Sequence, residues 1–131
     1  MFPELQAIVE KVQACAARSR ALRIRGGGTK DFYGQRLHGE LLDVRPLSGV
    51  VSYEPSELVV TVRGGTRLRE LEELLAESHQ HLPFEPPRYG SASTVGGAVA
   101  AGLSGPGRAS VGALRDYVLG VQIVNGKGEV L

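Results

Sequence analysis

Glycine residues gathered in short groups constrain this chain more than any other feature of its sequence. Glycine makes up 18 of the 131 residues, roughly double the usual share of about 7%. Because glycine tolerates positive φ and lets another backbone approach closely, these groups favour loops in which the main chain itself makes the contacts. The groups fall at residues 26–28, 64–65, 96–97 and 102–107, each beside a segment that reads as a strand or a helix.

Chain length and composition indicate one globular domain with an ordinary core, since 42% of the residues are hydrophobic and 22% are charged. The formal net charge is +1, and basic residues are scattered among acidic ones, so nucleic acid and anionic membranes are not expected partners. The long uncharged run at residues 89–107 is too rich in glycine, alanine and serine to span a membrane.

Cysteine content excludes an internal disulfide and a cysteine-based zinc site, because Cys15 is the only cysteine. The three histidines are interpreted as surface groups, so no metal site is expected. Glu4 and Glu10 lie where a signal peptide would need a basic start and an apolar core. We therefore expect a reducing, cytoplasmic location.

Hydrophobic periodicity predicts a helix from about Pro3 to Arg18, whose apolar residues recur at intervals of three and four. A strand at residues 21–25 ends at the first glycine group, and a loop runs from there to about His38. Three short runs rich in leucine and β-branched residues follow as strands, at residues 40–44, 50–53 and 58–63.

A second helix is predicted after the glycine turn at residues 64–65, with Thr66 as its N-cap. Residues 81–84 are interpreted as a returning strand, which would complete a right-handed βαβ unit. The helix ends near Ser78, and its buried stripe consists of four leucines, Leu68, Leu71, Leu74 and Leu75.

A change of composition at Pro86 predicts a boundary between two subdomains, residues 1–86 and 87–131. In the second, residues 117–124 are interpreted as an apolar strand and residues 125–128 as a hairpin turn that starts a return strand. A strand that stops as soon as it starts would leave an open sheet edge. We therefore expect the second subdomain to be truncated and the natural protein to continue beyond Leu131.

The first candidate binding segment comprises residues 25–30, directly after a predicted strand. A phosphate needs converging backbone N–H groups, which residues without side chains can present as a nest. Thr29 would add a hydroxyl and Lys30 a cation. The alternative is a tight glycine turn followed by a solvated lysine, and this segment alone leaves both interpretations open.

The second candidate segment, residues 93–102, combines small residues with an expected helix N-terminus, where unpaired N–H groups favour an anion. Ser93 and Thr94 would cap the helix or bind the anion. The alternative is a helix whose glycines, Gly96 and Gly97, serve only close packing. Neither segment matches the P-loop or the dinucleotide fingerprint, so a kinase-type or Rossmann site is not expected.

Together, the order and separation of the two segments resemble the FAD-binding domain of the vanillyl-alcohol oxidase and p-cresol methylhydroxylase (PCMH-type) family. Nearly the whole chain looks more specifically like the E-subunit family of bacterial glycolate oxidases. The resemblance implies an α+β fold with a small parallel or mixed sheet, helices and the beginning of a second FAD-binding subdomain. It is carried by residues 22–34 (LRIRGGGTKDFYG), 82–87 (LPFEPP), 102–106 (GLSGP) and 115–128 (RDYVLGVQIVNGKG).

The resemblance further implies that the two segments hold the pyrophosphate of FAD from two sides, and that backbone near residues 121–123 faces the adenine. Some relatives attach the flavin covalently through a histidine after the first glycines. This chain has Thr29 at that position, so noncovalent FAD is expected. The implied cofactor-binding residues are Arg25, Gly26, Gly27, Gly28, Thr29, Lys30, Ser93, Thr94, Gly96, Gly97, Val121 and Ile123.

The function implied is the FAD-binding part of an oxidoreductase, the glycolate oxidase E subunit, in which flavin-mediated electron transfer converts glycolate to glyoxylate. Expected partners are a D-type flavoprotein and an iron–sulfur subunit, which could also hold the protein at the inner membrane. Substrate and catalytic residues of the family follow the point where this chain ends, so it is not expected to be active alone. The alternatives are a noncatalytic assembly module that docks partner subunits and a stand-alone phosphate-binding domain.

Overall fold

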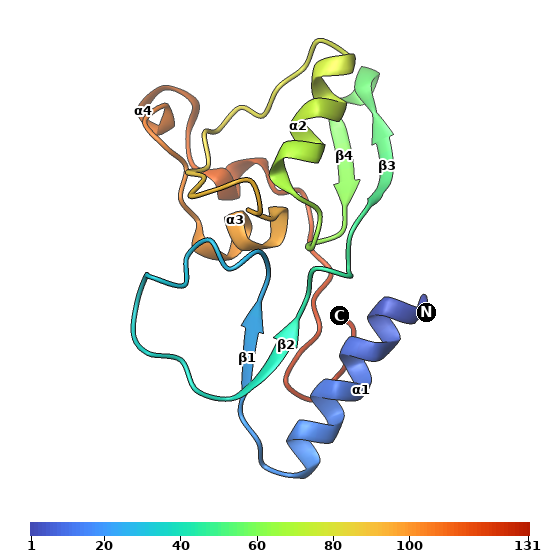
Figure 1. Ribbon diagram of the computed structural model, residues 1–131. Coiled ribbons are helices and arrows are strands. Elements are labelled where there is room, and N and C mark those ends of the chain that lie inside the picture. Colours follow the sequence, from blue (N-terminus) through green and yellow to red (C-terminus); the bar gives the residue numbers. More distant parts are fainter.

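The computed structural model describes all residues, 1–131, as helices packed around two small sheets (Figure 1). This confirms the predicted α+β class. None of the helices has the length and apolar character that a membrane crossing needs. In chain order the elements are α1 (Pro3–Ala17), β1 (Leu22–Arg25), β2 (Glu40–Asp43), β3 (Val50–Glu54), η1 (Pro55–Glu57), β4 (Val59–Val62), α2 (Leu68–Glu77), α3 (Val95–Ala101), α4 (Arg108–Val111) and η2 (Leu114–Tyr117).

Each sheet has only two strands. β1 and β2 pair in parallel with Ile24 opposite Leu42, whereas β3 and β4 pair antiparallel with Tyr53 opposite Val60. Figure 1 shows α1 beside the first sheet and α2 beside the second. Because a two-stranded sheet is marginal by itself in water, both pairs depend on the helices and loops that pack against them.

α1 forms as predicted because its apolar residues share one face and Pro3 occupies the first turn, where its missing N–H is not needed. On that face Ile8 and Val12, each 8% exposed, pack with Leu42 of β2. Val124 joins the same cluster from near the C-terminus. The two ends of the chain therefore share one small core beside α1 (Figure 1).

A second cluster is built on the leucine stripe of α2. Leu68 of α2, Ala98 of α3 and Leu114 of η2 are only 2% to 3% exposed and pack together. Leu71 and Leu75 of the predicted stripe are also buried, whereas Leu74 is half-buried. This cluster fixes α3, and with it the second candidate segment, against the start of α2.

The predicted return strand at residues 81–84 is wrong. These residues form an irregular segment, and β4 pairs only with β3, so no βαβ unit exists. Pro83 lacks the N–H that a ladder would need, and Leu82 and Phe84 bury themselves against the second cluster instead. Packing, rather than strand pairing, decides the path of this segment.

The predicted strand at residues 117–124 is also wrong. Its first residue belongs to η2, a 3-10 turn in which the N–H of Ala113 donates to Asp116 Oδ2 at 3.0 Å. Pairing begins only at Ile123, which exchanges two backbone hydrogen bonds with Leu131, and continues at the bridge between Val124 and Val130. Residues 118–122 meet no neighbouring strand, so they have no ladder to join.

Two smaller predictions had opposite outcomes. The turn at residues 125–128 is confirmed, with the N–H of Gly128 donating to the carbonyl of Asn125 at 2.9 Å. Thr66 is not the N-cap of α2, a position that Arg67 occupies. Thr66 is instead 1% exposed, and its hydroxyl accepts from the N–H of Gly49 at 2.9 Å and donates to its carbonyl at 3.2 Å.

The substitution Leu68→Ala tests the second cluster. Because Leu68 is 2% exposed, we expect the free energy of unfolding to fall by about 2 to 5 kcal/mol, the usual cost of a cavity left by a buried leucine. Urea unfolding followed by circular dichroism measures the change. Leu119→Ala, at a side chain that is 81% exposed, is the matched control, and equal losses in the two variants would contradict the assignment of this core.

Candidate functional site

The two glycine-containing segments of the sequence meet in the folded chain. Thr29 Oγ1 lies 3.2 Å from Ser93 Oγ, although the two residues are 64 positions apart. Ser93 is 3% exposed, so this contact lies within the fold rather than on a mobile surface. We name residues 26–30 the first loop and residues 92–97 the second loop.

Glycines allow the loops to come this close. A Cβ atom on Gly27 would overlap the backbone carbonyl of Ala92, and one on Gly26 would lie 2.9 Å from Thr94 Oγ1. Gly27 has no positive φ, so sterics rather than backbone conformation require glycine there. Main chain therefore faces main chain across the junction.

The second loop is fixed by contacts with the turn that precedes α2. Gly96 donates its N–H to the carbonyl of Gly64 at 2.8 Å, and Val95 donates to the carbonyl of Thr66 at 2.8 Å. A Cβ on Gly96 would lie 2.8 Å from the same Gly64 oxygen. The close packing that was the alternative interpretation of this segment is therefore present, and anion binding by it stays a prediction.

The sequence left open whether Ser93 or Thr94 caps α3. Thr94 is the N-cap, and its hydroxyl accepts a hydrogen bond from the N–H of Gly97 at 3.1 Å. Ser93 faces the first loop instead, with further contact to the carbonyl of Gly90 at 3.4 Å. Of the two hydroxyls, only that of Ser93 stands at the junction with Thr29.

The first loop is braced by an ion pair at its two ends. Arg25, at the end of β1, donates from Nε and Nη2 to Asp31 Oδ2 at 3.0 and 2.8 Å. The hydrogen bonds from Arg25 lower the pKa of Asp31 below its usual value, and those to Asp31 raise the pKa of Arg25. Gly28, with φ of +70°, packs directly beneath the guanidinium group. The ion pair therefore links the two ends of the first loop.

The remaining predicted site residues have different surroundings. Lys30 is half-buried and forms none of the ion pairs of the protein, so its ammonium group is available to an anion. Val121 and Ile123 are 65% and 51% exposed. Ile123 is hydrogen-bonded to Leu131 across the C-terminal turn, and no hydrogen bond joins either residue to the two loops.

Sequence reasoning missed the supporting residues of the site. The backbone of Ala92 packs against Gly27, and the carbonyl of Gly64 accepts a hydrogen bond from Gly96. Asp31 accepts hydrogen bonds from Arg25. The glycines at residues 64–65 were a visible signal, but they were interpreted only as the start of a helix. An alanine carbonyl and a single aspartate carry no sequence signal for such roles.

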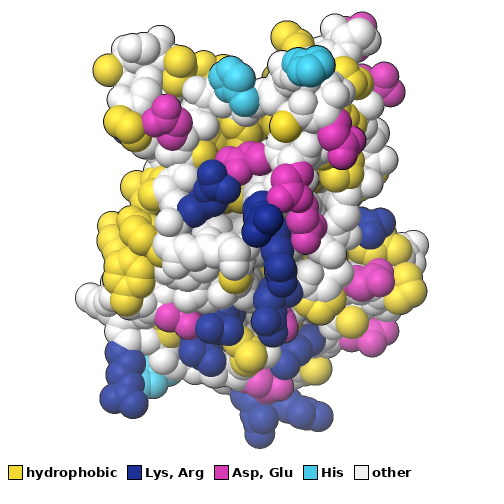
Figure 2. Space-filling view, turned by 45° about the horizontal axis from the view of Figure 1, so that its top comes forward, with side chains coloured by type: hydrophobic (Ala, Val, Ile, Leu, Met, Phe, Trp, Pro, Cys, Tyr) yellow, Lys and Arg dark blue, Asp and Glu magenta, His cyan; other side chains and the backbone are white.

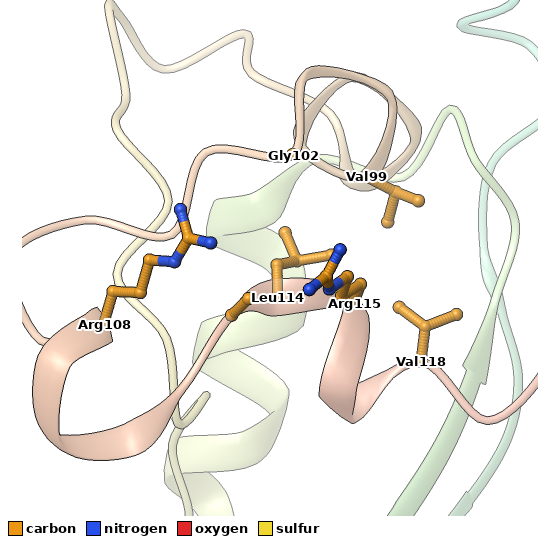
Figure 3. A pocket seen from close by; sticks show the side chains of 7 residues that line it. Val99, Gly102, Arg108, Leu114, Arg115 and Val118 are labelled. Carbon is orange, nitrogen blue, oxygen red and sulfur yellow. The ribbon is translucent and has the colours of Figure 1, made fainter.

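Two hollows lie near these elements. One, of about 310 Å³, has no hydrophobic lining and opens beside Ser93 between Arg69, Arg88, Gly90 and Ser91. The other, of about 450 Å³, lies under α3 and is shown in Figure 3, lined by Val99, Gly102, Arg108, Ala113, Leu114, Arg115 and Val118. Only the first shares a residue with the junction of the loops.

The junction fits an anionic group such as a phosphate. It combines the hydroxyls of Thr29 and Ser93 with Lys30, which follows Thr29 in the chain and forms no ion pair. It does not suit a metal ion, because no group of three histidine, cysteine, aspartate or glutamate side chains within residues 1–131 could hold one.

Comparison with known proteins identifies one family and one fold. Residues 3–131 match the model of the FAD binding domain. Glycolate oxidase subunit GlcE of Escherichia coli (strain K12) is 45% identical over 126 residues, which cover 96% of this chain and 36% of that protein. This chain thus spans little more than a third of the length of that relative.

Solved structures with a similar fold have much lower sequence identity. Phl p 4, a grass pollen allergen with glucose dehydrogenase activity, matches 100% of this chain and 28% of its own with a TM-score of 0.78 at 21% identity. Alkyldihydroxyacetonephosphate synthase matches 96% of this chain and 24% of its own with a TM-score of 0.75 at 21% identity. At this identity the likeness concerns the fold alone.

The substitution Asp31→Asn tests the ion pair between Arg25 and Asp31 that links the ends of the first loop. Since the pKa of Asp31 is lowered in the folded state, the pair stabilises the loop above the usual carboxylate pKa, and that contribution is lost as the pH falls through the folded-state value. We expect lower hydrogen-exchange protection at residues 28–31 in the variant at neutral pH, and convergence with the wild type in acid.

Glu57→Gln, which makes the same chemical change at a glutamate without an ion pair, is the control for this measurement. A difference between Asp31→Asn and the wild type that persists unchanged at low pH would show that the charge of Asp31 does not hold the loop.

Proposed function

This chain belongs to the FAD-binding domain family, with the fold of the vanillyl-alcohol oxidase and p-cresol methylhydroxylase type, and from that premise we propose that its first and second loops grip the pyrophosphate of FAD. The observation that carries the proposal is the direct contact of the loops at Thr29 and Ser93. The N–H groups of Gly27 and Gly28 donate no hydrogen bond within the chain, so they would be available to an anion.

The residues of the site would have different roles in binding. Glycine N–H groups of the first loop and the hydroxyls of Thr29 and Ser93 would donate hydrogen bonds to phosphate oxygens, and Lys30 would supply a positive charge. Arg25 is engaged by Asp31, so its role would be to shape the loop. FAD, when bound, supplies the redox chemistry, while the protein supplies position and electrostatics.

We expect the flavin to be bound noncovalently. At the position where some relatives carry a flavin-linked histidine, this chain has Thr29, whose hydroxyl is already paired with Ser93. A threonine lacks the imidazole nitrogen that forms such a bond. The backbone near Val121 and Ile123 is proposed to face the adenine, with the cofactor reaching from the loops toward the exposed segment before the C-terminal turn.

The whole protein is proposed to be the E-type subunit of a glycolate oxidase, which takes part in the oxidation of glycolate to glyoxylate. The 45% identity to subunit GlcE supports this assignment. A D-type flavoprotein and an iron–sulfur protein are the proposed partner subunits. Subdomains at residues 1–86 and 87–131 and a cytoplasmic location remain predictions from the sequence.

A titration of FAD with the purified protein tests the proposed function. Binding with a dissociation constant in the micromolar range or tighter should quench the flavin fluorescence, and denaturation should release the flavin unmodified. Absence of quenching, together with stable association with partner subunits, would instead support the noncatalytic assembly module.

The substitution Gly27→Ala tests the loops themselves. Its added methyl group would overlap the carbonyl of Ala92, so the loops must separate, and we expect FAD affinity to fall by about tenfold or more. Gly120→Ala is the matched control, because a Cβ there meets no atom within 4 Å and Gly120 has no positive φ. Unchanged affinity in folded Gly27→Ala would remove the first loop from the site.

A further inference from the structure

The polar hollow beside Ser93 has an unusual lining. Its volume is about 310 Å³ and none of its lining residues is hydrophobic. Ser93, which contributes to the lining, also contacts Thr29 of the first loop. The hollow therefore opens directly beside the place where the two loops meet.

Two arginines from different parts of the chain line this hollow. Arg69 comes from the first turn of α2, and Arg88 comes from the irregular segment that leads into the second loop. Figure 2 shows lysine and arginine side chains gathered down the middle of one face of the molecule, with acidic side chains beside the uppermost of them.

Each of the two arginines is held in place by a glutamate of α2. Arg69 Nε lies 2.8 Å from Glu73 Oε1, and Arg88 Nη1 lies 2.5 Å from Glu72 Oε2. Neither glutamate lines the hollow, whereas both arginines do. A guanidinium group has five N–H donors, so one ion pair leaves donors free to face a ligand.

The loops alone are short of positive charge for a diphosphate. Lys30 is the one cation within the two loops. The pyrophosphate of FAD carries two negative charges, and burying them beside uncharged donors is costly unless cations are near. Arginine suits this task because its planar fork can bind two phosphate oxygens at once.

We propose that Arg88 and Arg69 are phosphate-binding residues that supply the counter-charge for the diphosphate group of the cofactor. Glu72 and Glu73 each form an ion pair with one of the two guanidinium groups but do not line the hollow, and they are not themselves needed for binding. This inference rests on the proposed function and names two further residues of the same site, neither of which lies in the glycine loops.

A merely structural role for Arg88 is the main competing explanation, because its ion pair with Glu72 ties the segment before the second loop to α2. The variants Arg88→Gln and Glu72→Gln separate the two roles. Both variants remove the ion pair between Arg88 and Glu72, but only Arg88→Gln removes the positive charge. Arg88→Lys keeps a charge without the planar fork.

The experiment is a fluorescence titration of FAD with the wild type and these variants at low and high ionic strength. We expect Arg88→Gln to weaken FAD binding by about tenfold or more, the further change Arg69→Gln to weaken it again, and Arg88→Lys to restore part of the loss. Glu72→Gln should bind FAD as tightly as the wild type, and the salt dependence should be smaller in Arg88→Gln.

Equal weakening in Arg88→Gln and Glu72→Gln would overturn the inference in favour of a structural tie. Wild-type affinity in folded Arg88→Gln combined with Arg69→Gln would also overturn it, while the proposed function would stand. A wild-type protein that binds no FAD would overturn the proposed function, and the inference with it.

Discussion

The close approach of two stretches of main chain, at Gly27 and Ala92, is the contact on which the rest of this structure depends. A single Cβ on Gly27 would overlap the Ala92 carbonyl, so the spacing of the loops is set by the absence of a side chain. The hydroxyl pair of Thr29 and Ser93 lies at the same junction. The close backbone approach and the contact between the two hydroxyls therefore occur at one place.

Small cores hold the loops in this arrangement. The first cluster, with Ile8, Val12 and Leu42, supports β1 and thereby the entry to the first loop. The second, with Leu68, Ala98 and Leu114, supports α3 and the exit from the second loop. Since each sheet has only two strands and such pairs are marginal alone, these clusters provide much of the rigidity that a preorganised binding site needs.

Fold and function rest on different evidence in this protein. Chains that are only 21% identical share its fold with TM-scores of 0.75 and 0.78, which shows that many sequences can build it. The proposed assignment to a glycolate oxidase subunit comes instead from the 45% identity to GlcE. A fold of this kind offers a place for FAD, and the side chains around it decide how the cofactor is held.

Local pattern in the sequence was sufficient for α1, for the four strands and for the turn at residues 125–128, because periodicity and turn residues act over a few positions. The resemblance carried by four separate stretches indicated the FAD-binding family, which the family match over residues 3–131 confirms. Local pattern failed at residues 81–84 and 117–124, where apolar residues have a strand-like composition but no strand lies alongside to pair with them.

What only the tertiary structure decided is which groups meet. Three contacts join residues from separate segments of the chain. They are the contact of Thr29 with Ser93, the packing of Gly27 against Ala92 and the ion pair of Arg88 with Glu72. A sequence pattern reports the intrinsic preference of each segment, whereas these contacts depend on how separate segments pack around shared cores. For that reason the turn at residues 26–28 and the helix start at residues 96–97 could be predicted from the sequence, but their partners could be found only in the folded chain.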